Sequence, residues 1–135
     1  MTESKRQELL ATEIRTFTDL VNRQRAWSTA QFGETVPIDR ILNHITEEVA
    51  EVKAEPGTLH NWIDIVLLAF DGAWRAGHSP KEVVQAIQDV QVRNIMREWL
   101  DTKDLLPGQP NSHKLSQAER IKKGELTEEE ARLEK

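Results

Sequence analysis

Glu48 and Glu51 are the first side chains in this sequence whose types and spacing could do chemistry together. In a helix, residues i and i+3 lie on neighbouring positions of one face. Two carboxylates placed in this way can bridge or chelate a hard cation. By the same angular count, the preceding Glu47 points to the opposite side. A solvated, glutamate-rich helix face would show the same pattern, so this segment alone leaves both interpretations open.

A second group of polar residues lies on the next predicted helix. Asn61, Asp64 and Asp71 are separated by three and seven residues, which places them along one line of an otherwise apolar segment. An ionised aspartate in apolar surroundings is costly unless it is paired or bound to a metal. Asp64 is therefore a candidate ligand. Asp71 has an alternative, which is to pair with Arg75 one helical turn further on.

Negative charge accumulates over these two segments. Between residues 39 and 71 the bases are Arg40 and Lys53. The acids in the same stretch are Asp39, Glu47, Glu48, Glu51, Glu55, Asp64 and Asp71. A divalent cation is the natural compensation for this excess. Ligands that all provide oxygen favour Mg²⁺, or Mn²⁺, over zinc.

Two further sets of side chains could contact a phosphorylated ligand. Arg93 and Arg97 form an i, i+4 pair with Asn94 between them, and they could hold phosphate groups that a metal does not reach. They could equally be ordinary surface residues. Trp27 and Phe32 lie near the end of the first predicted helix and could stack on a nucleobase. Core packing is the alternative for these two aromatic residues.

Apolar residues recur every three or four positions in four segments, which predicts four helices. Their expected ranges are about 4–30, 38–54, 59–76 and 80–99. Ser79 and Glu82 form a capping box at the start of the fourth. The third is apolar on nearly all faces, which predicts that it is buried. Four helices with short loops indicate an all-α, four-helix-bundle-like fold, completed by a second copy of the chain.

The residues after Asp101 have a different character. Residues 102–135 are charged and almost free of aromatic side chains, and Ser116 and Thr127 could cap two short helices. We therefore predict a helical domain over residues 1–101 and a C-terminal arm over 102–135. This arm could pack on a neighbouring subunit, or it could be a solvated tail.

Bulk composition narrows the class of partner. The chain has 135 residues, a net charge of -5 and no cysteine. An acidic chain does not attract nucleic acid by its overall charge, and without cysteine there is no disulfide framework. The longest apolar run, residues 65–70, is too short to span a bilayer. We therefore expect no nucleic-acid or membrane partner, and we expect a cytoplasmic location.

Taken together, these residues resemble a known family. The segments 48–51 (EVAE) and 61–64 (NWID) are similar to the paired ExxE and ExxD motifs of the MazG-like all-α nucleoside triphosphate pyrophosphohydrolases. The run 71–77 (DGAWRAG) resembles the branch of bacterial and phage dATP/dGTP diphosphohydrolases. The remaining similar positions are Trp27-Ser28, Phe32-Gly33, His44-Ile45, Arg93-Asn94, Arg97 and Trp99. The resemblance covers about residues 14–101.

The resemblance implies a set of catalytic residues. Glu48, Glu51 and Asp64 would ligate Mg²⁺ ions that bridge the phosphates, and an activated water would attack the α-phosphorus and release pyrophosphate. Glu47 could orient that water if it turned inward. Asn61 departs from the family pattern, which has an acid there; its carbonyl oxygen can still bind a cation, but without negative charge.

The resemblance also implies the substrate and the assembly. The expected substrate is a purine deoxynucleoside triphosphate, dGTP or dATP, and the expected assembly is a homodimer or homotetramer. Asp71 could compensate for the charge missing at Asn61. Two other functions remain open. One is a pyrophosphatase for pyrimidine or non-standard triphosphates; the other is a non-catalytic helical interaction module, which predicts no metal dependence.

Overall fold

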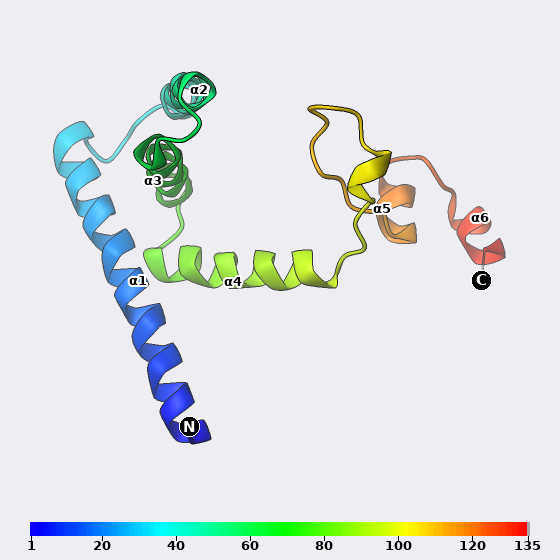
Figure 1. Ribbon diagram of the computed structural model, residues 1–135, viewed down its shortest axis with the longest axis horizontal. Helices are drawn as coiled ribbons and strands as arrows, with labels where there is room; N and C mark the ends of the chain where they lie inside the picture. Colours follow the sequence, from blue (N-terminus) through cyan, green and yellow to red (C-terminus); the bar gives the residue numbers. More distant parts are fainter. Residues whose placement is uncertain (135) are drawn as a thin grey trace. The chain divides into compact units, whose positions relative to one another are not determined.

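The computed structural model describes residues 1–134, and these residues are helical in the way that the sequence predicts (Figure 1). The elements are α1 (Glu3–Phe32), α2 (Ile38–Ala54), α3 (Leu59–Arg75), α4 (Pro80–Met96), the 3₁₀ helix η1 (Thr102–Asp104), α5 (Gln117–Lys122) and α6 (Glu128–Leu133). The all-α class is confirmed. The chain forms two compact units, residues 1–89 and a second one that starts at Val90. The division falls inside α4; the predicted domain boundary after Asp101 stays a prediction.

The ends of α1 and α4 differ from the predicted ends for local reasons. α1 continues to Phe32 and ends at Gly33, whose φ of 84° reverses the chain and whose N–H donates to the carbonyl of Thr29. A positive φ is readily adopted only by glycine. α4 begins at the predicted capping box, where the N–H of Glu82 donates to Ser79 Oγ at 3.1 Å. It ends at Met96, three residues before Trp99, because residue 99 pairs with a later segment.

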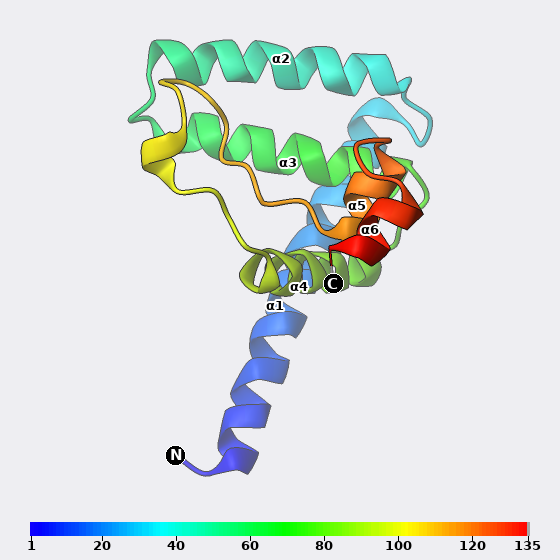
Figure 2. The same ribbon diagram turned by 90° about the vertical axis from the view of Figure 1, so that its right-hand side faces the viewer.

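Within the first unit, α2 and α3 lie side by side, and α1 packs against α3 (Figure 2). Each of the three helices buries an apolar side chain: Val21 of α1, Ile41 of α2 and Trp74 of α3. Phe17 of α1 meets Phe70 of α3 edge to face, with ring centroids 6.0 Å apart. Burial of these side chains holds the three helices in the arrangement that forms the cavity described below.

The prediction that α3 is buried is wrong for a single chain. Leu59 is 67% exposed, Trp62 50%, and Ile63 and Val66 42% each. Trp62 is therefore not a core residue; its indole N–H donates to the carbonyl of Pro56 at 2.9 Å. The sequence shows that α3 is apolar on nearly all faces, but the other helices of one chain do not cover all of these faces. Burying these side chains would require another surface.

The second unit is folded by its own contacts. Trp99 and His113 form an isolated antiparallel bridge, and their rings meet edge to face at 5.8 Å. Glu119 lies 3.2 Å from His113 Nε2 and 3.5 Å from Arg97 Nη2. The two short helices begin at capping boxes on Ser116 and on Thr127, as the sequence predicted. Whether this segment acts as an arm on a neighbouring subunit stays a prediction.

Among the described residues, no helix combines the length and the apolar character that crossing a membrane requires.

Candidate active site

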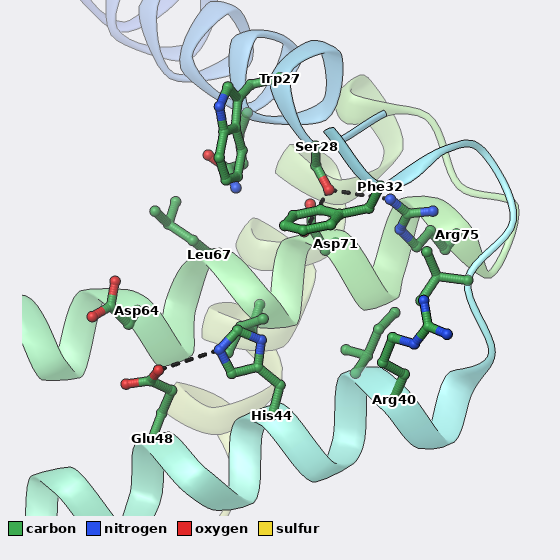
Figure 3. A pocket seen from close by; sticks show the side chains of 14 residues that line it. Trp27, Ser28, Phe32, Arg40, His44, Glu48, Asp64, Leu67, Asp71 and Arg75 are labelled. Atoms are coloured by element: carbon green, nitrogen blue, oxygen red, sulfur yellow. Dashed lines mark hydrogen bonds and ion pairs between the residues drawn. The ribbon is translucent and has the colours of Figure 1, made fainter. Parts of the chain in front are cut away.

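A cavity of about 250 Å³ lies between α1, α2 and α3 in the first unit (Figure 3). Two of its acidic side chains, Glu48 and Asp64, come from α2 and α3 and lie at the same end. Its lining residues are Gln24, Trp27, Ser28, Phe32, Val36, Arg40, Ile41, His44, Glu48, Asp64, Leu67, Leu68, Asp71 and Arg75. Polar groups at the ends of a largely apolar hollow are typical of small-molecule sites.

Glu48 is the most unusual group in this cavity. Its side chain is 13% exposed, and Oε1 lies 3.4 Å from Nε2 of His44, one turn earlier on α2. Within residues 1–134, Oε2 is buried and has no hydrogen-bond partner. An unpaired buried carboxylate oxygen is costly. Such an atom points to a ligand that completes its contacts.

The charges around Glu48 indicate what kind of ligand this is. Burial raises the pKa of Glu48, and the negative charges of Glu51 and then Asp64 and the close approach of the Glu51 carboxyl group raise it further, against the opposing effect of His44. Glu51 and Asp64 therefore both repel the charge of Glu48. A cation placed among them would relieve both the repulsion and the unpaired oxygen.

The donor set fits a divalent cation that keeps other ligands. In residues 1–134 no three His, Asp or Glu side chains converge closely enough, as they stand, to enclose one ion. Mg²⁺ commonly binds through one or two carboxylates and completes its shell with water and substrate phosphates. Glu48 and Asp64 line the cavity, while Glu51 is exposed beside it. This open acidic end suits that mode of binding.

Two other predicted site residues lie outside the cavity. Glu47 is exposed and lines a second, shallow recess with Pro37, Asn43, and with Arg40 and His44, which also line the cavity. Its position agrees with the angular count on α2. Asn61 is half-buried one turn before Asp64 and does not line the cavity. The roles of both residues stay predictions.

Asp71 does not form the expected direct pair with Arg75. It is buried; its Oδ2 accepts from Ser28 Oγ at 2.8 Å, and its Oδ1 accepts from Trp74 Nε1 at 3.0 Å. Arg75 reaches this network through Ser28, whose Oγ accepts from Nη2 at 3.1 Å. Both carboxylate oxygens of Asp71 are therefore engaged, and the residue ties α1 to α3 instead of supplying a spare charge for Asn61.

Arg75 fixes the segment that follows α1. Its Nη1 donates to the carbonyls of Gly33 at 2.8 Å and Glu34 at 3.0 Å. Its guanidinium lies 4.1 Å from the centroid of the Trp74 ring, a cation–π contact. These contacts hold the turn directly after Phe32, so they also position that side chain at the cavity.

Trp27 and Phe32 form an aromatic wall at the cavity. They are 54% and 53% exposed, and their rings meet edge to face with their centroids 5.7 Å apart. Figure 3 shows both side chains directed toward the hollow, across from Leu67. The alternative that they are core residues is wrong, while their role in holding a base stays a prediction.

Arg93, Asn94 and Arg97 belong to the second unit. Arg97 is paired with Glu119, and the backbone carbonyl of Asn94 accepts from Trp99 Nε1 at 2.8 Å. Arg93 is exposed. A role for these three residues in binding phosphate stays a prediction.

Sequence analysis missed several lining residues. Arg40, His44 and Glu48 follow one another at i, i+4 and i+8 on α2, a spacing that could have revealed a shared face. Ser28 and Gln24 carried no local signal, because their place in the cavity depends on how α1 crosses α3.

Comparison with known proteins gives one result. No curated protein and no solved structure matches the chain. The family model of the dATP/dGTP pyrophosphohydrolases matches residues 20–120, well over half of the sequence and all of the cavity. The chain therefore belongs to the dATP/dGTP pyrophosphohydrolase family and is a nucleoside triphosphate pyrophosphohydrolase.

Proposed function

We propose that this enzyme hydrolyses a purine deoxynucleoside triphosphate, dGTP or dATP, to the monophosphate and pyrophosphate in a reaction that requires Mg²⁺. The observation that carries the proposal is the buried, unpartnered Oε2 of Glu48 in a cavity that also has an aromatic wall. The acidic end suits metal-complexed phosphates, and the wall formed by Trp27 and Phe32 suits a base. The family match supports the substrate class.

Glu48 and Asp64, with Glu51 beside them, would hold Mg²⁺, for which Mn²⁺ could substitute. When bound, the ion neutralises phosphate charge and lowers the pKa of a water molecule that it activates. The role of the chain is to hold the carboxylates in place. His44 contributes by its contact with Oε1 of Glu48, which orients that carboxylate and leaves Oε2 directed to a ligand. Asn61 would add at most a neutral oxygen.

The aromatic wall would bind the base and exclude water from it. Trp27 and Phe32 are held at a fixed angle to each other, and the network of Ser28, Asp71 and Arg75 anchors the end of α1 that carries them. A hollow of about 250 Å³ suits a nucleobase better than a whole triphosphate. The charged part of the substrate would then extend over the acidic end.

Assembly as a homodimer or homotetramer is part of the proposal. The exposed apolar side chains of α3 (Leu59, Trp62, Ile63 and Val66) support it, since a second copy would remove them from water. A cytoplasmic location stays a prediction.

The test is pyrophosphate release from a panel of eight ribo- and deoxynucleoside triphosphates, with Mg²⁺, with Mn²⁺ and with EDTA. We expect metal-dependent release from dGTP and dATP, and loss of that release in Glu48→Gln. Glu13→Gln, an exposed residue of α1, is the control and should match the wild type. Release from pyrimidine nucleotides alone would favour the alternative function, a pyrophosphatase for pyrimidine or non-standard triphosphates. No release from folded protein would overturn the proposed reaction.

A further inference from the structure

The cavity has two electrically different ends. Glu48 and Asp64 lie at one end, and Arg40 and Arg75 lie at the other, with the aromatic wall between them (Figure 3). On α2 the distance from residue 48 back to residue 40 is about 12 Å along the helix axis, at about 1.5 Å per residue. A ligand whose phosphates meet a cation at the acidic end would therefore direct its other end toward the arginines.

The two arginines differ in how their donors are used. Arg75 is committed, since it donates to the carbonyls of Gly33 and Glu34 and to Ser28 Oγ. The side chain of Arg40 makes no hydrogen bond or ion pair with any residue of the described chain, 1–134, although it lines the cavity. A guanidinium provides five N–H donors in a planar fork and no acceptor. Arg40 is thus the group at this end that can contact a ligand.

The other polar atoms at this end cannot replace it. Asp71 accepts from Ser28 and Trp74 with its two oxygens, and the Ser28 hydroxyl both donates to Asp71 and accepts from Arg75. A base lying against Trp27 and Phe32 would therefore meet donors at its outer edge and no free carboxylate. Donors in this position would distinguish the two purines, because guanine and adenine present different groups there.

We propose that Arg40 reads the edge of the purine and makes guanine the preferred base. Guanine presents two neighbouring acceptors, O6 and N7, to which the arginine fork donates two parallel hydrogen bonds. Adenine presents N7 beside the N6 amino group, and that donor would face another donor. This inference rests on the proposed function and narrows its substrate to dGTP.

The experiment measures kcat/KM for dGTP, dATP and 7-deaza-dGTP, which lacks the N7 acceptor, with the full chain and Mg²⁺. The variants are Arg40→Gln, Arg40→Lys and the control Arg23→Gln, an exposed arginine of α1 away from the cavity. Glutamine pairs with N6 and N7 of adenine. Circular dichroism checks that each variant is helical.

We expect the wild type and Arg23→Gln to prefer dGTP over dATP, and to use 7-deaza-dGTP less well than dGTP. Arg40→Gln should lower kcat/KM for dGTP by about tenfold or more, which corresponds to about 1.4 kcal/mol, and should not lower it for dATP. Arg40→Lys keeps the charge but lacks the fork, so it should also lose the preference. If Arg40→Gln does not fold, the 7-deaza-dGTP comparison in the wild type decides.

Four outcomes would overturn the inference. Equal loss for dGTP and dATP in Arg40→Gln would mean that Arg40 holds phosphate. Unchanged selectivity in that variant, equal use of 7-deaza-dGTP and dGTP by the wild type, or a wild-type preference for dATP would mean that the fork does not read the base. In each of these cases pyrophosphate release still occurs and the proposed function stands. The proposed function would fail on a different result, namely no pyrophosphate release from any purine triphosphate.

Discussion

The hydroxyl of Ser28 on α1 donates a 2.8 Å hydrogen bond to Oδ2 of Asp71 on α3, and both side chains are buried. This bond joins α1 to α3 through two residues that are 43 positions apart in sequence. It lies directly behind the aromatic wall. The position of Trp27 and Phe32 in the cavity therefore depends on a polar contact in the interior of the unit.

Asp71→Ala should destabilise the protein. The change leaves Ser28 and the indole N–H of Trp74 without their acceptor, and an unsatisfied buried polar group costs about 1–3 kcal/mol. Urea denaturation followed by circular dichroism measures the free energy of unfolding. Asp89→Ala, at an exposed position, should change it by no more than about 0.5 kcal/mol. Equal effects of the two substitutions would contradict the structural role of Asp71.

Mg²⁺ should raise the melting temperature of the wild type and not that of Glu48→Gln. A ligand that binds only the folded state adds about 2.7 kcal/mol at a concentration one hundred times its Kd. Thermal unfolding with increasing Mg²⁺, in the absence of nucleotide, measures this effect independently of turnover. Ca²⁺ is a useful comparison because of its larger size. The same rise in both proteins would remove Glu48 from the cation site.

Glu119→Gln should reduce the loss of stability in acid. Burial raises the pKa of Glu119, but the hydrogen bonds from His113 and the Ser116 backbone, with the charges of His113 and Arg97, leave this pKa below its ordinary value. A lowered folded-state pKa adds stability above the unfolded value, and this contribution is lost as the pH falls through the folded value. The wild type should therefore lose its advantage over the variant below about pH 4.5.

The measurement is the unfolding midpoint of each protein in urea from pH 3 to pH 7. Glu125→Gln, an exposed glutamate in the same unit, should show the pH dependence of the wild type. The opposite result would be a difference in unfolding midpoint between the wild type and Glu119→Gln that increases as the pH falls. It would show that the pair with His113 does not stabilise the Glu119 anion.

Ile63→Lys should reduce the mass of the assembly. Ile63 is 42% exposed beside Trp62 and Val66, and a charge in an apolar interface is costly. Light scattering after size exclusion should give a dimer or tetramer for the wild type and a smaller species for the variant. Glu13→Lys, at an exposed position of α1, is the control. A monomeric wild type would show that the apolar face of α3 does not join two copies.

Local pattern was enough to predict the helices and part of the site. Periodicity located α2 and α3 almost to the residue, and two of the candidate residues on these helices, Glu48 and Asp64, line the same cavity. The end of α4 was missed because the pairing of Trp99 with His113 is not local. Arg40 was missed because its i, i+4 and i+8 spacing with His44 and Glu48 was not used, and that spacing gives a shared face without showing that a cavity lies there.

The role of Asp71 required tertiary information. From sequence, the i+4 spacing favoured a pair with Arg75, since both lie on one helix. In the folded unit a residue from α1, Ser28, stands between them and accepts from one while it donates to the other. Only the crossing of α1 over α3 brings this hydroxyl into place.

At the turn after α1, Gly33 is restricted by its backbone conformation, whereas the neighbouring position 32 is not. Its φ of 84° would strain any residue with a side chain, although a Cβ there would meet nothing within 4 Å. Phe32, one position earlier, is in ordinary helix and half exposed. At this edge of the cavity the side chain at position 32 can therefore be exchanged, while the backbone conformation at Gly33 must be kept. Engineering of base preference can begin with a library at position 32, with the adjoining glycine left in place.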